Sequence, residues 1–593
     1  MKKRTMIIRY NISLKLKSLL LVITFATMMG CDSVLDDVED LSNYPGQGTF
    51  DDVQTVNAYL SALYGSTFGG WPLNFGNNAD ESGGIIAPNW ITETNGTMKF
   101  WPYNIIRRVN IMLEELPVGE VPVGDQDELL AQAKFIRAFL YFKMVYYHGG
   151  VPIIEVPQNL DDDLEVTRNS TAECFDFIIR DLDDAISGLP ATYNGDEFGK
   201  IDKVFAKAFK AKVLLYKASP QFNPSNPYDN SSWQDAYAAN LEAKQYLEGQ
   251  GFGLLDNYTA VFETSNHREN VFSVVYQDPI KVNGRREDAV RPLSESKNAT
   301  GGDQPIWALA KAYPMKDGKI PGDPTSEYSY DVQHFWENRD PRFEATLVWN
   351  GAVYPVSGKS GRRQYTMANV SHSVDAFGYV IQGGQGQYRT GLFCRKGIME
   401  ELPIELVGTN DVDWPEMRFA EVLFNFAEAA NETGHLDEAV QVLLDIRARA
   451  GIEPGSDGMY GITSGMNRDQ LREAILQEKY IEMAFEGQRF WDLRRHRKLD
   501  RLDGMKKYGV MAMTLNGKAY NEVTSEDQLA ANSSTLLPDE FTYEIVELIS
   551  NGPKEMSMPE TYYFFPIQSS HIDRNPKLEQ NVGWSGGTFD PTL

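Results

Sequence analysis

The sequence predicts a mainly α-helical protein, in which tetratricopeptide-like helix pairs form a scaffold and an irregular, loop-rich binding lobe carries a few short strands. Two observations support this fold class. Apolar residues recur at steps of three and four through 97–250 and again through 416–450, as on one face of a helix. In the region 251–415, glycine, proline and aromatic residues crowd together, as in long ordered loops. We therefore divide the main fold into an N-terminal helical part (49–250), the loop-rich lobe (251–415) and a C-terminal helical part with a terminal segment (416–593).

Three patterns define helices in the N-terminal part. Residues 97–116 place Trp101 and the apolar residues that follow it on one helix face. Residues 127–147 carry two apolar stripes, so this helix is expected to pack against neighbours on two sides. Ser170 with Glu173 forms a capping box, which predicts that a helix begins there.

The clearest helix pair lies at 416–450. Its two amphipathic stretches are separated by a short glycine-containing turn at 431–434, with small alanines where the helices would cross. This arrangement is typical of a tetratricopeptide-like unit. Helices predicted at 202–218 and 233–248 have a similar spacing. Within the lobe, the β-type run at 271–276 predicts one of the short strands.

The N-terminus has the pattern of a segment that is removed. Residues 1–17 carry six basic side chains and no acidic one, and an apolar run at 19–29 follows, too short to span a bilayer. A glycine then precedes Cys31, which resembles a bacterial lipoprotein signal whose cysteine is acylated. A plain secretory peptide with an incidental cysteine is the alternative. We predict a lipoprotein signal peptide at 1–30 and an acidic flexible tether at 31–48.

Composition narrows the class of ligand. The formal net charge is −27, and loss of the basic N-terminal segment would make the chain more acidic still. Such a surface repels nucleic acid and anionic lipid head groups, so we expect neither as a ligand. Beyond Cys31 only Cys174 and Cys394 remain, and the sequence leaves open whether they pair. Cys174 lies in an apolar helical pattern that is typical of a buried side chain.

No motif in the sequence indicates catalysis. The seven histidines are scattered, with no two at metal-ligand spacing on one helix, and HExxH, CxxC and GxSxG are absent. A glycosidase pair of carboxylates is defined in space and not in sequence, so this class stays open. We predict a protein that is not an enzyme and has no cofactor; whether it binds structural calcium cannot be seen in the sequence.

Five segments, in order along the chain, carry a resemblance to a known family. They are Ala133–Phe142 with His148–Pro152, Asn338–Arg342, Arg418–Leu423 continuing through Ala427–Ala429 to Ile446–Gly451, Glu478-Lys479 with Glu486–Arg495, and Pro566-Ile567 with Asn575–Asn581. Together with the lipoprotein signal, these segments resemble the SusD/RagB family of outer-membrane nutrient-binding lipoproteins. Lys479 stands where the family commonly has arginine.

The resemblance implies a lipoprotein on the cell outer membrane, anchored through acylated Cys31 and facing the cell exterior. It also implies a partner, a SusC-type TonB-dependent β-barrel transporter that proteins of this family cap like a lid. The spacing of the motif residues themselves indicates a structural role. Arg489, Asp492 and Arg495 fall at steps of three on one helix face, and we expect them to lock helices through ion pairs.

Capture of a neutral glycan requires exposed aromatic faces for sugar rings and polar groups for hydroxyls. Tryptophans in glycine- and proline-rich loops are the best candidates, because those on helical stripes, Trp101 and Trp491, are expected in the core. The resemblance agrees, since known glycan-binding members of the family place stacking aromatic residues in two general regions, after the first helix and in the loops near residues 285–330. The alternative is that each tryptophan only packs its loop. The predicted ligand-binding residues are Trp71, Trp90, Trp307, Tyr328, Tyr330, Asn78, Asp80 and Asn89.

The sequence thus leads to three hypotheses. The first is a cell-surface lipoprotein that binds oligosaccharides or polysaccharides and delivers them to a SusC-type transporter. The second is the same lid role for peptides or another nutrient. The third is a surface glycoside hydrolase. The sequence names neither the sugar nor the linkage.

Overall fold

The computed structural model describes residues 48–83, 91–94, 98–159, 161–297, 301–368, 374–378, 389–515, 537–548 and 555–593. The predicted signal peptide, Cys31 and the tether up to residue 47 lie outside these ranges, as do Asn89 and Trp90. Within the ranges, no helix is both long enough and apolar enough to cross a membrane.

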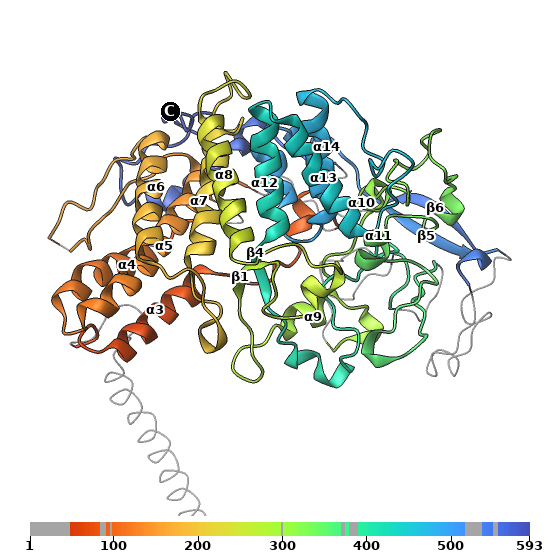
Figure 1. The fold of residues 1–593 in the computed structure, drawn as a ribbon, viewed down its shortest axis with the longest axis horizontal. Coiled ribbons are helices and arrows are strands. Elements are labelled where there is room, and N and C mark those ends of the chain that lie inside the picture. The colour runs from red at the N-terminus through yellow and green to blue at the C-terminus, as the bar shows by residue number, and fades with distance from the viewer. Residues whose placement is uncertain are drawn as a thin grey trace, which may run out of the picture.

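Long helices stand side by side in a row across the molecule (Figure 1). They are α3 (Val53–Thr67), α4 (Tyr103–Glu115), α5 (Val123–His148), α6 (Thr171–Gly188), α7 (Lys203–Ala218), α8 (Ser232–Gly249), α12 (Phe419–Glu432), α13 (Leu436–Ala450) and α14 (Arg468–Glu482). From α4 to α8 each helix packs on the next, α8 then packs on α12, and α13 and α14 follow. This array confirms the predicted mainly α fold with tetratricopeptide-like pairs.

Local chemistry explains where these helices begin. Ser170 and Glu173 form the predicted capping box in front of α6. Asp202 accepts a hydrogen bond from the Phe205 amide at the start of α7, as an N-cap residue does. The predicted helix at 97–116 begins only at Tyr103, after a proline that disfavours helical geometry in the residue before it. Trp101 therefore precedes α4 and does not lie on it.

The loop-rich side carries three two-stranded antiparallel sheets within the described ranges. β1 (Asn270–Val274) pairs with β4 (Trp414–Arg418), β2 (Leu347–Val348) with β3 (Phe393–Cys394), and β5 (Tyr508–Thr514) with β6 (Phe541–Glu547). β1 confirms the strand predicted within 271–276. The short helices are α9 (Gly284–Val290), α10 (Trp307–Ala312), α11 (Pro341–Thr346), α15 (Arg489–Arg495) and α18 (Ser569–Ile572), and two 3₁₀ turns matter below, η1 (Phe75–Asn78) and η7 (Val332–His334).

Two main clusters of buried apolar side chains hold these parts together. The larger lines the helical array and takes residues from α3 to α7, β1, β4, α12 to α14 and the terminal segment. The second lies on the loop-rich side and joins α10, α11, β2 and β3 to β5 and β6. Helix α14 contributes to both clusters, so it connects the scaffold to the loop-rich side.

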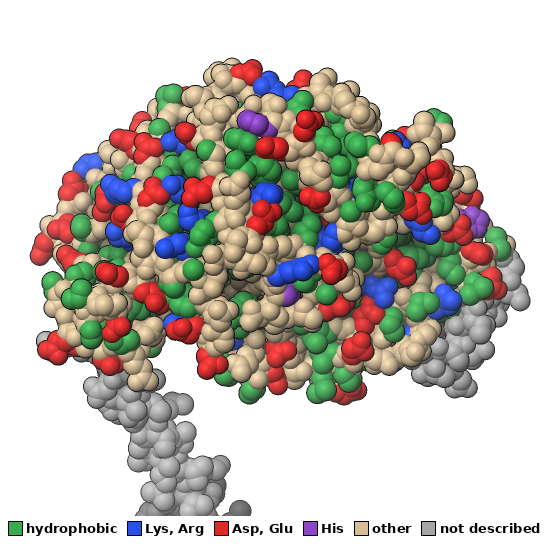
Figure 2. Space-filling model, viewed as in Figure 1, with side chains coloured by type: hydrophobic (Ala, Val, Ile, Leu, Met, Phe, Trp, Pro, Cys, Tyr) green, Lys and Arg blue, Asp and Glu red, His purple; other side chains and the backbone are tan. Residues whose placement is uncertain are grey.

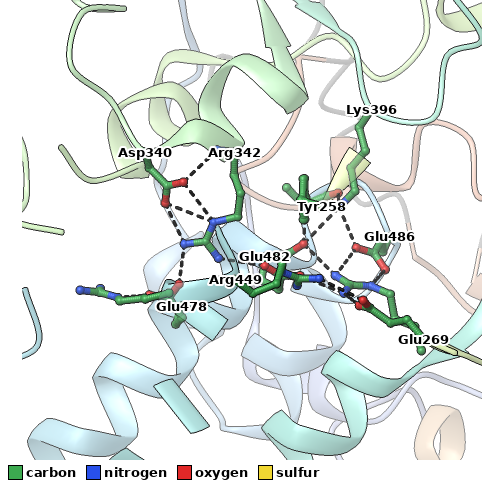
Figure 3. Close-up of polar contacts among 12 residues, drawn as sticks. Tyr258, Glu269, Asp340, Arg342, Lys396, Arg449, Glu478, Glu482 and Glu486 are labelled. Carbon is green, nitrogen blue, oxygen red and sulfur yellow. Dashed lines mark hydrogen bonds and ion pairs between the residues drawn. The ribbon is translucent and has the colours of Figure 1, made fainter. Parts of the chain in front are cut away.

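A buried network of ionic side chains crosses the same junction (Figure 3). Its acidic members are Glu269, Asp340, Glu478, Glu482 and Glu486, and its basic members are Arg342, Lys396, Arg418, Arg447 and Arg449. Arg418 lies 2.8 Å from each of three carboxylates, those of Glu269, Glu482 and Glu486. Because a buried charge without its partner is strongly unfavourable, the network fixes α11, β4, α13 and α14 relative to one another.

A second set of ion pairs locks helices as the sequence predicted. Asp492 on α15 lies 2.9 Å from Lys479 on α14 and 3.2 Å from Arg495. Arg495 in turn reaches Glu428 on α12 at 2.6 Å. Arg489 behaves differently, because its ion-pair partner is Asp80 in the segment after η1, and its guanidinium lies over the ring of Tyr480 on α14, 4.0 Å from the centroid. The lysine at 479, which departs from the family pattern, still supplies the cation that this set requires.

Cysteine chemistry is simple in the described part of the chain. Cys174 and Cys394 are both free and fully buried, so they do not pair. The Sγ atom of Cys174 lies 3.4 Å from both the amide nitrogen and the carbonyl oxygen of Val151. Burial raises the pKa of the Cys174 thiol to about 12, so it packs as a small neutral side chain.

Candidate binding site

Aromatic side chains gather beside the β5–β6 ladder, toward the right of Figure 1. Three of them, Trp307, Tyr330 and Trp336, are partly exposed and pack against the second core cluster. We call these three side chains the aromatic platform. Three buried rings lie against the platform or beneath it, those of Phe335, Trp349 and Tyr543.

Ring contacts fix how the platform is oriented. The indole of Trp336 lies nearly parallel to that of Trp349, with centroids 6.2 Å apart, and meets Tyr543 edge-on at 5.0 Å. The indole of Trp307 meets Phe335 edge-on at 5.5 Å. Such edge-on and offset arrangements are the favoured geometries for aromatic pairs. The supporting rings therefore hold both indoles rigidly while part of each stays accessible.

The chain around η7 is fastened to the edge of β6, which places Trp336. Asp331 caps this turn by accepting from the Gln333 amide. The Gln333 side chain then pairs with both backbone groups of Tyr543, donating to its carbonyl and accepting from its amide at 2.9 Å each. Phe335 is fully buried, so the next residue along the turn, Trp336, is left at the surface.

Trp307 is placed by a contact between two segments far apart in sequence. Residues 74–83 lie alongside residues 302–306, directly before Trp307. The Asn74 amide donates to Asp303 at 2.8 Å, and the Asp303 amide donates back to the Asn74 side chain at 3.1 Å. Two further backbone hydrogen bonds and one bridge continue the contact. The structure thus brings part of the chain between Trp71 and Trp90 next to the segment that leads into Trp307.

Buried charges fasten the 74–83 segment from the other side. The Lys507 ammonium donates to the carbonyl oxygens of Asn77 and Ser82, at 2.7 and 2.8 Å. Burial lowers the pKa of Lys507 to about 7. Arg489 forms a two-pronged pair with Asp80, at 2.9 and 2.8 Å. The segment is therefore rigid before any ligand arrives.

The platform and the residues next to it offer few polar groups that could bind a charged ligand. His334 lies 3.1 Å from Asp331, and both side chains are exposed. The Tyr330 hydroxyl and the Trp349 indole N–H are buried without a hydrogen-bond partner among the described residues. No cluster of three or more His, Cys, Asp or Glu side chains suited to a metal occurs in those residues either. The platform offers flat aromatic faces that suit stacking, with the guanidinium of Arg339 5.7 Å from the Tyr330 ring centroid and the imidazole of His334 beside Trp336.

The predicted site residues fall into separate places. Trp307 and Tyr330 lie on the platform, whereas the Tyr328 hydroxyl donates to Glu453 at 2.7 Å. Asn78 ends η1, and Asp80 is held in its pair with Arg489. Trp71 lies elsewhere, where its ring packs on Trp414 at 4.9 Å and its indole N–H donates to the Val412 carbonyl at 3.1 Å. Trp101 and Trp491 both pack, partly buried, against the larger core.

Trp336 was not among the predicted residues, although it is the best-supported ring of the platform. A signal was present in the sequence, because Trp336 stands two residues before the Asn338–Arg342 motif and follows the selected Tyr328 and Tyr330 closely. Its partner Tyr543 comes from a strand some two hundred residues later, and nothing local in the sequence indicates that pairing.

The charge on the surface agrees with the composition. Figure 2 shows acidic side chains spread over both the helical and the loop-rich sides of this face, with Lys and Arg scattered among them. No continuous basic patch is seen on the part of this face that the structure describes. The surface shown is thus unlike one that binds a polyanion.

Comparisons with known proteins agree with this fold. The chain matches the SusD family over residues 268–584 and a family described as starch-binding and associating with the outer membrane over residues 76–215. A curated relative, SusD-like protein P2 of Formosa agariphila, is 25% identical over 420 residues, covering 68% of this chain and 72% of the relative.

Solved structures give the same result for the fold. A SusD-like protein of Bacteroides fragilis superposes with a TM-score of 0.70 at 22% identity, covering 91% of this chain and 98% of the other. A SusD-like carbohydrate-binding protein of the same species gives 0.68 at 23% identity, covering 90% and 100%. A laminarin-binding SusD-like protein gives 0.59 at 20% identity, covering 90% and 100%. Because the first family match spans more than half of its 593 residues, this chain belongs to the SusD family.

Proposed function

We propose that this protein binds oligosaccharides or polysaccharides on its aromatic platform and releases them without chemical change. The observation that carries this is the set of rigid, partly exposed indoles of Trp307 and Trp336 beside Tyr330. Sugar rings present C–H groups that pack on aromatic faces, and a neutral ligand suits a platform made mainly of aromatic rings. The printed descriptions of two structural neighbours, one carbohydrate-binding and one laminarin-binding, support the same class of ligand.

Hydrolysis is the less favoured candidate function. In the segment that contacts residues 302–306 directly before Trp307, Glu81 is the carboxyl group whose pKa burial raises toward neutrality, to about 8. Glu81 is only 1% exposed and accepts a hydrogen bond from the Phe485 amide, so a sugar on the platform cannot reach it. We therefore propose a binding protein, and steady product formation by pure protein on any glycan that it binds would contradict this.

The location and partner form a second part of the proposal. The family described as associating with the outer membrane supports attachment at that membrane. We propose that acylated Cys31 supplies the anchor, that the chain faces the cell exterior, and that it caps a SusC-type TonB-dependent transporter. The proposed lobe at 251–415 contains the platform. We propose that the helical parts at 49–250 and 416–593 make the contact with the transporter.

The class of ligand is tested by measuring the binding of polysaccharides and of peptides to the same purified protein. Purified protein is run by affinity electrophoresis in gels that contain neutral polysaccharides, including laminarin and starch, and is titrated separately with peptide pools. We expect retardation by at least one polysaccharide and no heat of binding with peptides. Saturable peptide binding without any polysaccharide binding would favour the peptide-capture hypothesis instead.

Anchoring and partner are tested in one membrane experiment. The wild-type protein is expected to fractionate with the outer membrane and, after mild detergent extraction, to elute together with a large β-barrel protein. The Cys31→Ser variant cannot be acylated at that position, so it should appear in the soluble fraction. Membrane retention of Cys31→Ser, or elution of the wild-type protein as a lone monomer, would contradict the corresponding part of the proposal.

A further inference from the structure

A second pocket lies within the helical side of the molecule, away from the platform. It has a volume of about 260 Å³ and opens between the loop after α3 and helices α5, α7, α12 and α15. The volume is below the roughly 300–1,000 Å³ of sites for drug-sized ligands, so it suits a small solute. None of its lining residues belongs to the platform or to the rings beneath it. We call it the scaffold pocket.

Several polar groups in the scaffold pocket lack a partner. Asn425 on α12 is only 2% exposed, yet its side-chain amide makes no hydrogen bond to the described residues. The hydroxyl groups of Tyr146, Tyr147 and Tyr216 are likewise without a protein partner in the described ranges. These groups line the pocket and are not among the described side-chain atoms sealed from solvent without a partner, so water or a ligand can satisfy them.

Two opposite charges in the pocket also remain apart. The Lys143 ammonium forms no ion pair in the described chain and lies over the ring of Phe100, 4.7 Å from its centroid. Glu416 accepts a hydrogen bond from the Trp414 indole at 3.1 Å but contacts no cation within ion-pair distance. Burial lowers the pKa of Lys143 and raises that of Glu416, so both charged forms would gain from a hydrogen-bonding guest.

Aromatic rings form one wall of the scaffold pocket. The indole of Trp491 has its centroid 4.8 Å from those of Tyr146 and Tyr147, and it stacks on Phe75 at 5.7 Å. The neighbouring charges of Lys212 and Glu421 already neutralise each other at 2.7 Å. A guest must therefore present an apolar face to the rings and both donors and acceptors to Lys143, Glu416 and the amide.

We propose that the scaffold pocket binds one small neutral polyhydroxylated ring, a molecule of monosaccharide size. Its hydroxyls accept from Lys143, donate to Glu416 and pair with the amide of Asn425, while its C–H face packs on the aromatic wall. This goes beyond glycan capture on the platform, because the two sites share no residue and take ligands of different size.

The test uses the purified full chain titrated with free D-glucose, D-galactose, D-mannose and L-fucose, followed by calorimetry and by tryptophan fluorescence. We expect saturable binding of at least one sugar. Lys143→Met and Glu416→Gln should each weaken it about tenfold, the loss expected for one charge-assisted hydrogen bond. Lys134→Met is the matched control, because this lysine is also on α5 but pairs with Asp184 outside the pocket. It should bind as the wild type does.

Two further variants separate binding from folding and from the platform. Asn425→Leu replaces an unmatched amide by an apolar group of similar volume, so it should abolish sugar binding without lowering the melting temperature. The Trp307→Ala/Trp336→Ala variant lacks the platform and should retain monosaccharide binding. The proposal is overturned if no sugar in the panel binds saturably, or if Lys143→Met and Asn425→Leu bind as the wild type does. Loss of monosaccharide binding in the platform variant would also overturn it, and would place that sugar on the platform.

Discussion

Arg418→Met is expected to lower the free energy of unfolding by about 3–5 kcal/mol, the range typical when one partner of a buried ion pair is removed. Arg418 is fully buried and satisfies three carboxylates from two separate segments of the chain, Glu269 before β1 and Glu482 and Glu486 at and just after the end of α14. Burial raises the pKa of Glu482, but the guanidinium groups of Arg449 and Arg418 more than offset this and hold it well below its usual range. Without Arg418, Glu482 and Glu486 keep their burial and lose a counter-charge.

Urea unfolding followed by circular dichroism measures this change. Arg180→Met is the matched control, because Arg180 also pairs with a glutamate, Glu155, but the two side chains are 55% and 51% exposed. Exposed pairs contribute about 0–1 kcal/mol, so this variant should unfold almost as the wild type does. Similar losses in both variants, or a loss below about 1 kcal/mol for Arg418→Met, would show that the buried network does not hold the two cores together.

Trp336→Ala and Trp307→Ala should each weaken glycan binding by about tenfold or more, and the double variant should bind no glycan detectably. Removal of an indole takes away a flat contact area that no other side chain replaces, and rigid aromatic residues are frequent hot spots of binding energy. Dissociation constants are measured by calorimetry with an oligosaccharide of the polysaccharide selected in the gels. Trp336→Phe, which keeps a ring, should lose less.

Trp101→Ala provides the control for this pair. Trp101 is also partly buried, but it packs against His571 and the larger core. It should lower the melting temperature and leave glycan affinity unchanged. If Trp101→Ala weakens binding as much as the platform variants do, the effect of those variants is a general loss of structure and the platform is not the site.

The helical scaffold could be predicted because its signals are local. Apolar periodicity and the capping box of Ser170 and Glu173 each involve residues of a single helix, and they place α6 correctly. The pairing of Asp492 with Arg495 is equally local, at three residues on one helix. The late start of α4 is the one error among these helices, and it arises because a proline follows Trp101.

The candidate site could be predicted only in part, because its geometry depends on distant segments. Trp71 and Trp307 stand in similar glycine- and proline-rich surroundings, yet the indole N–H of Trp71 is taken by a carbonyl 341 residues away. Asp80 was predicted to bind sugar hydroxyls, but its carboxylate forms an ion pair with Arg489, about four hundred residues later in the chain. Trp336 was missed for the same reason, since its support comes from Tyr543.

A crystal structure of the protein with an oligosaccharide of the selected polysaccharide tests the central claim most directly. The account predicts that at least one sugar ring lies parallel to the indole of Trp307 or Trp336, within van der Waals contact. It also predicts that the supporting rings of Phe335, Trp349 and Tyr543 keep their positions. An oligosaccharide bound elsewhere on the molecule, with both indoles uncovered, would contradict it.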